Sequence, residues 1–287
     1  MVRLWLMYKN KEEQANMQVE KDVIYDSAYN LAADLYVPDE ANGGAIVYAH
    51  GGGWFHGDKE NESDLGEYFA DAGYLFAIPN FRLAPKYLYP TAQNDFDHFI
   101  NWLLASPYDF DRERLGLLGA SSGGTMVLQN SLASGYPLVA WSPVVDFANW
   151  VQKNQMVKAS VDGKKELGLT EIHEIHDSFY KYFVQTYLGG LDPRLLTAVN
   201  PTNHLTDQLG PALLFNSADE LMPLPSALHF LQQAAMFGRD IGLHVVPGTG
   251  HARDYTSFAL PETKRFFDHH LFTTVEDKTL NKATDWA

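Results

Sequence analysis

Ser121 stands in the pattern G-x-S-x-G, formed with Gly119 and Gly123 inside the stretch "LGLLGASSGG" at residues 115–124. An apolar run typical of a strand precedes the pattern, and a segment with helical spacing follows it. The pattern alone could arise by chance, but a strand before it and a helix after it favour a nucleophilic serine, held on a strained backbone that requires small neighbours. We therefore predict that Ser121 reacts. Ser122 would then donate its backbone N–H to an oxyanion, although an ordinary helix-start residue fits that position equally well.

A serine hydroxyl is a weak nucleophile at neutral pH and needs a base oriented by a carboxylate. On an α/β-hydrolase scaffold these residues follow in the order Ser, acid, His, each just beyond a strand. Asp219 ends the run "ALLFNSAD", and His251 follows "LHVVPGTG" in a glycine-rich loop. We therefore predict Asp219 as the acid and His251 as the base. Glu220 is the rival acid, one residue deeper in the same loop.

A second motif, "HGGGW" at residues 50–54, follows the apolar run "AIVYAH". Consecutive glycines let backbone N–H groups converge on a developing alkoxide, where a Cβ atom would obstruct them. Read alone, the motif is also compatible with an ordinary glycine-rich turn. Because it follows an early strand and precedes the serine motif, we predict that it forms an oxyanion loop.

Strands and helices alternate along most of the chain, which predicts the α/β class. The expected strands cover residues 17–25, 32–38, 45–50, 74–80, 115–120, 137–143, 212–218 and 243–248. From the third onward they are short and nearly all apolar, as in a parallel sheet covered on both faces. The first two alternate more and suit an antiparallel edge. The expected helices cover residues 62–72, 91–105, 122–133, 224–237 and 261–271.

About 60 residues separate "WSPVVDF" from "PALLF" without a strand, far more than an ordinary connection needs. We expect a single domain over residues 1–287, with residues 147–205 as a small helical cap insertion within it. The insertion contains an aromatic-rich helix. Residues 273–287 are polar, which favours a flexible tail.

These motifs together resemble the hormone-sensitive-lipase-like esterases and lipases of the α/β-hydrolase superfamily. The resemblance rests on "HGGGW", "FRLAPKYLYP", "GASSGG", "SADELMP" and "GTGH", which occur in this order between about residues 45 and 255. It implies a mostly parallel eight-stranded sheet with helices on both faces. It also implies Ser121 as nucleophile, Asp219 as acid, His251 as base, and an oxyanion hole formed by Gly52, Gly53 and Ser122. Ala120 and Ser122 depart from the usual residues beside the nucleophile, and Lys86 from the usual glutamate.

Aromatic residues recur at helical spacing in the insertion and also follow the glycine loop. Packing alone would explain them, yet over a site they would also line an acyl pocket. We place Trp54, Phe55, Phe179 and Phe183 in the substrate pocket. The pair His173 and His176 suits a solvated helix face better than a metal site, since no third ligand is apparent.

The composition narrows the classes of function. The chain has 287 residues, no cysteine and a net charge of −15 from 21 basic and 36 acidic residues. Such a charge repels a nucleic-acid backbone and an anionic membrane, so neither is an expected partner. Without cysteine there is no thiol nucleophile or thiolate metal site. No apolar run is long enough for a membrane span or a signal segment, so we expect a soluble, cytoplasmic protein.

We therefore predict a serine carboxylesterase that hydrolyses acetyl to butyryl esters, including acetylated sugars, through an acyl-enzyme, with a small-molecule ester as its partner. No metal or organic cofactor is expected. The alternatives are an arylformamidase or small amidase that uses the same residues, and an inactive binding protein with the same fold. A homodimer is compatible with the sequence, which leaves the oligomeric state open.

Overall fold

One eight-stranded sheet forms the centre of the molecule, with strand order β1-β2-β4-β3-β5-β6-β7-β8. The computed structural model describes residues 17–272, so the tail predicted at residues 273–287 lies outside the described residues. The strands are β1 (Met17–Asp26), β2 (Leu31–Pro38), β3 (Ala45–Ala49), β4 (Leu75–Pro79), β5 (Leu115–Ala120), β6 (Leu138–Trp141), β7 (Ala212–Ser217) and β8 (Ile241–Val246).

The direction of the strands follows their hydrophobic pattern. Strands β3 to β8 pair in parallel, and β3 to β7 are buried along their whole length. The alternating strand β1 pairs antiparallel with β2, which in turn pairs antiparallel with β4. This arrangement confirms the predicted fold class, a mostly parallel α/β-hydrolase sheet with an antiparallel edge.

Two helical layers cover the sheet, each above its own hydrophobic cluster. Helices α3, α4 and α9 contribute to one cluster, and α2 and α10 contribute to the other. None of the helices within residues 17–272 combines the length and the apolar character needed to cross a bilayer. These five helices are α2 (Ser63–Asp71), α3 (Thr91–Ala105), α4 (Ser122–Ser134), α9 (Leu224–Met236) and α10 (Thr256–Phe272), and short 3-10 turns lie at η1 (Lys59–Glu62), η2 (Pro201–His204) and η3 (Ala252–Tyr255).

The last helix begins earlier than the sequence predicts. The expected helix starts at Pro261, a residue type that favours the first turn of a helix. The helix instead begins at Thr256 and contains Pro261 in its interior. Buried contacts of Ala259 and Leu260 with the second cluster stabilise the extra turn. Tertiary packing thus outweighs the local preference of proline.

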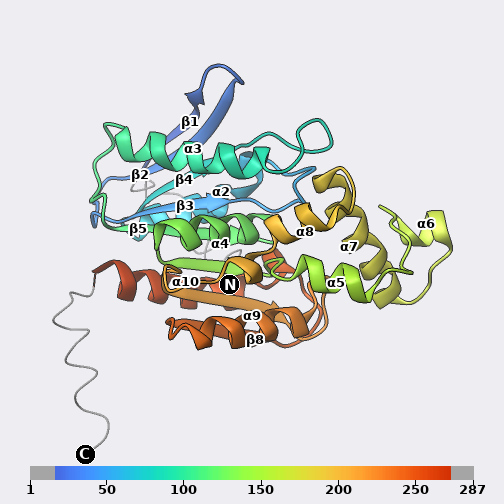
Figure 1. The fold of residues 1–287 in the computed structure, drawn as a ribbon. Helices are drawn as coiled ribbons and strands as arrows, with labels where there is room; N and C mark the ends of the chain where they lie inside the picture. Colours follow the sequence, from blue (N-terminus) through green and yellow to red (C-terminus); the bar gives the residue numbers. More distant parts are fainter. Residues whose placement is uncertain (1–16, 273–287) are drawn as a thin grey trace, which may run out of the picture.

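The segment between β6 and β7 is helical and lies at one end of the sheet (Figure 1). The segment contains four α-helices, whereas the sequence predicted one, rich in aromatic residues. They are α5 (Phe147–Lys153), α6 (Gly163–Leu167), α7 (Ile172–Leu188) and α8 (Pro193–Val199). The longest, α7, carries the aromatic residues noted in the sequence, and Phe183, Val184 and Tyr187 bury their side chains in the main cluster.

Phe69 ties the second helical layer to the sheet, and its removal tests this packing. Its fully buried ring on α2 stacks on Phe76 of β4, with 5.1 Å between the ring centroids, and meets Phe267 of α10 edge-on. We expect Phe69→Ala to lower the free energy of unfolding by about 3–5 kcal/mol, because it leaves a cavity. Phe258→Ala removes a ring that is 46% exposed and should cost less than about 1 kcal/mol. Equal losses in urea denaturation would contradict this account.

Candidate active site

The carboxyl ends of the parallel strands surround a pocket of about 540 Å³. Its walls come from the loops after β3, β5, β7 and β8 and from helix α7 of the insertion. Ser121 and His251, which are 130 residues apart in the sequence, both face this one space. The lining residues are Gly51, Gly52, Gly53, His56, Gly57, Asn61, Glu62, Ala120, Ser121, Phe179, Phe183, Leu221, His251, Ala252 and Arg253.

Ser121 occupies the turn between β5 and α4 in a backbone conformation that residues with a side chain rarely adopt. Its φ is 53° and its ψ is −120°. Its backbone N–H donates to the carbonyl of Trp141 at 2.7 Å, which anchors the turn to β6. Strained backbone of this kind occurs where the surrounding structure holds it in place, often at sites of chemistry.

The two glycines of the serine motif are required by close packing. A Cβ atom at Gly123 would lie 2.0 Å from the carbonyl oxygen of Ala49 on β3. A Cβ atom at Gly119 would lie 2.4 Å from the carbonyl oxygen of Gly123. Any side chain at either position would therefore push α4 away from the sheet and displace the turn that carries Ser121.

Glu220, and not Asp219, is the carboxylate that contacts His251, so the expectation of Asp219 is wrong at this point. Oε2 of Glu220 lies 2.5 Å from Nδ1 of His251. Asp219 is exposed, and its backbone N–H donates to the carbonyl of Gly248. The loop after β7 turns so that the longer side chain of Glu220 reaches back toward the strand. Only the path of this loop distinguishes the two neighbouring acids.

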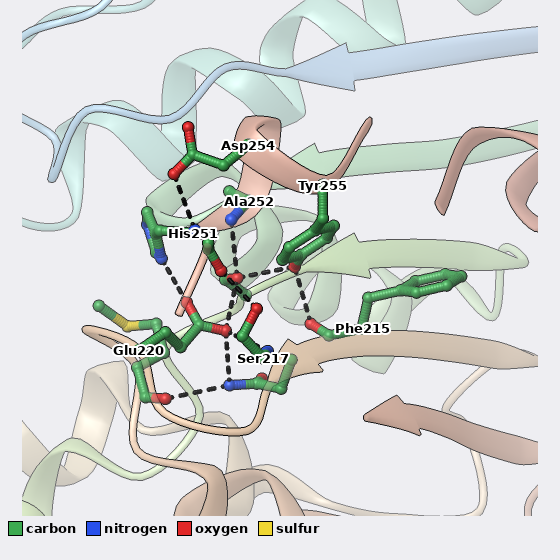
Figure 2. A network of polar contacts seen from close by, with 11 residues as sticks. Phe215, Ser217, Glu220, His251, Ala252, Asp254 and Tyr255 are labelled. Atoms are coloured by element: carbon green, nitrogen blue, oxygen red, sulfur yellow. Dashed lines mark hydrogen bonds and ion pairs between the residues drawn. The ribbon is translucent and has the colours of Figure 1, made fainter. Parts of the chain in front are cut away.

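The other oxygen of Glu220 is held by three donors (Figure 2). Oε1 accepts from the backbone N–H of Ser217 at 2.7 Å, from the side-chain amide of Asn216 at 3.0 Å and from the hydroxyl of Ser142 at 2.8 Å. A buried carboxylate needs such partners. Since a carboxylate only accepts, the hydrogen of the His251 contact belongs on Nδ1, which leaves Nε2 free to accept a proton.

His251 is also fixed through its backbone, since its N–H donates to Oδ2 of Asp254 at 2.9 Å. Figure 2 shows Asp254 and Glu220 on opposite sides of His251. The side chain of His251 keeps 26% of its surface exposed, toward the pocket that it lines. The ring of His251 is thereby oriented by Glu220 and remains accessible from the pocket.

The glycine loop after β3 takes a backbone conformation that suits glycine. The φ angles are 118° at Gly52, 60° at Gly53 and 61° at Trp54. Among residues 17–272, the backbone N–H groups of Gly52, Gly53 and Ser122 donate none of the hydrogen bonds within the protein. Three donors therefore remain available near Ser121, and their role as an oxyanion hole stays a prediction.

His50 supports this loop as an uncharged residue. It is buried, its Nδ1 lies 2.8 Å from the carbonyl oxygen of Gly51, and its ring stacks on Phe81 with 4.2 Å between centroids. Burial lowers the pKa of His50 to about 4, so the ring is neutral at pH 7. A neutral histidine contributes packing here and places no positive charge behind the glycine loop.

Two of the four predicted pocket residues line the pocket. Phe179 and Phe183 of α7 do so, together with Leu221, which the sequence analysis did not single out. Trp54 does not, because its side chain turns into the core and is 1% exposed. Phe55 lies against Phe179 and Tyr182, outside the lining. The left-handed backbone at Trp54 directs these two neighbours away from the space beside Ser121.

Part of the pocket wall is polar, and its residues were not identified from the sequence. Arg253 pairs with Glu62 through Nε at 3.2 Å and with Asp64 through Nη2 at 2.5 Å. Burial raises the pKa of Glu62, while the guanidinium of Arg253 opposes that shift. Arg253 lies two residues after His251, and this position could have indicated that it is near the site. Its partners could not be identified from the sequence, because they lie almost 200 residues earlier.

A second cavity of about 410 Å³ shares Phe179, Leu221 and His251 with the first. Its remaining lining includes His176, Asp254, Asp162 and Lys164. Burial lowers the pKa of His176. Within residues 17–272, no group of three or more histidine, aspartate or glutamate side chains could hold a metal ion.

Known proteins are similar to this chain in sequence and in fold. An arylesterase from Saccharolobus solfataricus is 32% identical over 126 residues, which cover 42% of this chain and 41% of that protein. An ethyl acetate hydrolase from Pseudomonas putida is 28% identical over 234 residues, which cover 78% of this chain and 71% of that protein. A solved esterase of the bacterial hormone-sensitive lipase family matches with a TM-score of 0.64 at 22% identity, covering 99% of this chain and 90% of that one.

The BD-FAE family model matches residues 33–233, which run from β2 into α9 and include Ser121 and Glu220. The match covers more than half of the 287 residues. The chain therefore belongs to the BD-FAE family, and its likeness to the solved esterase confirms the α/β-hydrolase fold.

Proposed function

We propose that this protein is a serine carboxylesterase in which Ser121, His251 and Glu220 form the catalytic triad. His251, oriented by Glu220, takes the hydroxyl proton as Oγ of Ser121 attacks the ester carbonyl. The backbone N–H groups of Gly52, Gly53 and Ser122 stabilise the oxyanion of the tetrahedral intermediate. His251 then protonates the leaving alcohol, and water releases the acid from the acyl-enzyme.

The contact between Glu220 and His251, on the wall of the pocket that Ser121 also lines, carries this proposal. Three donors fix this buried carboxylate, and the carboxylate in turn orients a histidine that faces an open pocket. A binding protein has no need for such an arrangement. The esterase relatives support the same reaction class. The proposal requires no metal or organic cofactor.

We further propose that the substrates are small, short-chain esters of polar alcohols, including acetylated sugars. Phe179, Phe183 and Leu221 provide an apolar wall for a short acyl group. The leaving oxygen must reach His251, so the alcohol lies toward the second cavity, where Asp254 and His176 offer polar contacts. The name of the Pseudomonas putida relative, ethyl acetate hydrolase, supports a short acyl group.

Replacing the nucleophile tests the reaction itself. We expect Ser121→Ala to lower kcat for p-nitrophenyl acetate by at least about 1,000-fold, since within residues 17–272 no other residue with a hydroxyl lines the pocket. A fluorophosphonate probe should label the wild type and not this variant. Ester hydrolysis or labelling that survives the substitution would remove the basis of the proposal.

Replacing each acid in turn decides between the two carboxylates. We expect Glu220→Gln to lower kcat by about 1,000-fold to 10,000-fold, because an amide no longer holds His251 in the required tautomer. Asp219→Asn is the matched control and should keep kcat within about threefold, because its side chain is exposed. The opposite ranking of the two variants would restore Asp219 as the acid.

The acyl preference can be measured with p-nitrophenyl esters from acetate to palmitate. We expect kcat/KM to be highest for acetate or butyrate and to fall for longer chains. Phe179→Ala opens the apolar wall and should improve octanoate relative to acetate by about 10-fold. A rate that climbs steadily from butyrate to palmitate in the wild type would refute a short-chain preference.

A further inference from the structure

We propose that Tyr187 is a positioning residue for the reaction, which holds the glycine loop in its active conformation by stacking on Trp54. The inference rests on the proposed esterase function and deepens it. It gives helix α7 a structural role in the oxyanion hole, in addition to its role as a pocket wall. It also assigns a purpose to the motif "FRLAPKYLYP", which the catalytic residues do not use.

The loop at residues 52–54 needs support from outside itself. Its three residues in succession have positive φ angles, and the last of them is a tryptophan, for which this region is unfavourable. Within the loop, the carbonyl of Gly52 accepts from the backbone N–H groups of Phe55 and His56 at 3.2 and 3.1 Å. The N–H groups of Gly52 and Gly53 make no hydrogen bond within residues 17–272.

Trp54 and Tyr187 form the tightest parallel ring contact near the site. Their ring centroids are 4.1 Å apart, and their planes differ by 4°. Both side chains are almost fully buried, and Phe147 and Phe183 pack on other sides of Trp54. Stacked aromatic rings in a dry environment resist rotation, so this contact fixes the side chain of Trp54 and, through its Cα atom, the end of the loop.

A second residue of α7, Phe183, lies against the loop at Gly53, one helical turn before Tyr187. A Cβ atom added to Gly53 would lie 3.1 Å from the Cβ atom of Phe183 and 2.8 Å from the ring of Phe55. Phe183 and Tyr187 are four residues apart and lie on the same face of α7. This face therefore covers both Gly53 and Trp54.

The segment at residues 81–90 also supports the loop, through hydrogen bonds to both Trp54 and Tyr187. The N–H of Ala84 donates to the carbonyl of Trp54 at 2.8 Å, and the N–H of Tyr89 donates to the carbonyl of Tyr187 at 2.9 Å. The segment is itself anchored to α3, where Arg82 donates two side-chain hydrogen bonds to Asp95, at 2.9 and 2.6 Å. Loop, helix and segment thus hold one another around the Trp54–Tyr187 stack.

The ring of Tyr187, and not its hydroxyl, performs this task. The hydroxyl is buried and has no hydrogen-bond partner within the described residues. Loss of the ring should let the loop leave its left-handed conformation, which would turn the N–H groups of Gly52 and Gly53 away from the pocket. Since these groups stabilise the transition state more than the bound ester, kcat should fall while KM changes little.

The test compares wild type, Tyr187→Leu and Tyr187→Phe. We expect Tyr187→Leu to lower kcat for p-nitrophenyl acetate by about 10–100-fold with KM within about threefold, and to weaken binding of a trifluoromethyl ketone by a similar factor. Tyr187→Phe keeps the stack and should keep kcat within about threefold. Should Tyr187→Leu fail to fold, Tyr187→Met, which better conserves the volume, takes its place with the same expectation.

Tyr180→Leu is the matched control for a purely structural effect. Tyr180 lies on the same helix and is equally buried, but its ring packs on Trp150 of α5, with 4.2 Å between centroids, and on Phe183, with 4.9 Å. Within residues 17–272 it makes no ring contact with Trp54. The Tyr180→Leu variant should have a melting temperature lowered about as much as that of Tyr187→Leu, but its kcat should not fall. Equal kcat losses in the two variants, or a loss confined to KM, would overturn the proposal.

Amide hydrogen exchange of the peptide covering residues 51–57 tests the support without reference to activity. Exchange should be faster in Tyr187→Leu than in the wild type and Tyr180→Leu. Unchanged exchange would refute the positioning role even if the wild type proves to have no esterase activity. An inactive wild type would by itself count against the reaction assigned to Ser121.

Discussion

The buried carboxylate of Glu220 is the interaction on which the arrangement of the site depends. It accepts from residues at the end of β7, from Ser142 after β6, and from His251 after β8. A carboxylate removed from water tolerates burial only when donors surround it, so the loops that supply these donors must converge. Three neighbouring strand ends are thereby held in one geometry, and the histidine receives both its orientation and its tautomer from this contact.

Ser142 and Tyr255 extend this network into the core. The hydroxyls of Ser142 and Tyr255 lie 2.7 Å apart, and Tyr255 also donates to the carbonyl of Phe215 at 3.1 Å. Ser142 in addition accepts from the backbone N–H of Ala252, next to His251. The position of the histidine is therefore tied to the sheet through Glu220 and through a set of buried contacts around Ser142. Such networks are rigid, because a donor that moves away leaves a partner unsatisfied.

The glycine loop at residues 52–54 is stabilised in a different way. There the N–H groups of Gly52 and Gly53 have no partner within residues 17–272, so the amides of these glycines cannot hold the loop, whose hydrogen bonds run through its carbonyls. Aromatic packing does so instead, from Trp54 to Phe147, Phe183 and Tyr187 of the insertion. The insertion between β6 and β7 thus contributes to the pocket wall and to the backbone beneath it. A loop whose donors must remain available to a ligand has to be stabilised through its side chains and carbonyls.

The sequence by itself determined the alternation of strands and helices, the serine turn, the histidine and the glycine loop. Each depends on residues close together in the chain, such as Gly119 and Gly123 around Ser121 or the consecutive glycines after β3. Only the tertiary structure decided between Asp219 and Glu220, turned Trp54 into the core, and brought Arg253 to Glu62. These outcomes depend on the direction of single side chains and on contacts between distant segments. Local spacing carries no information about either, because the chain folds back through loops whose paths are set by packing.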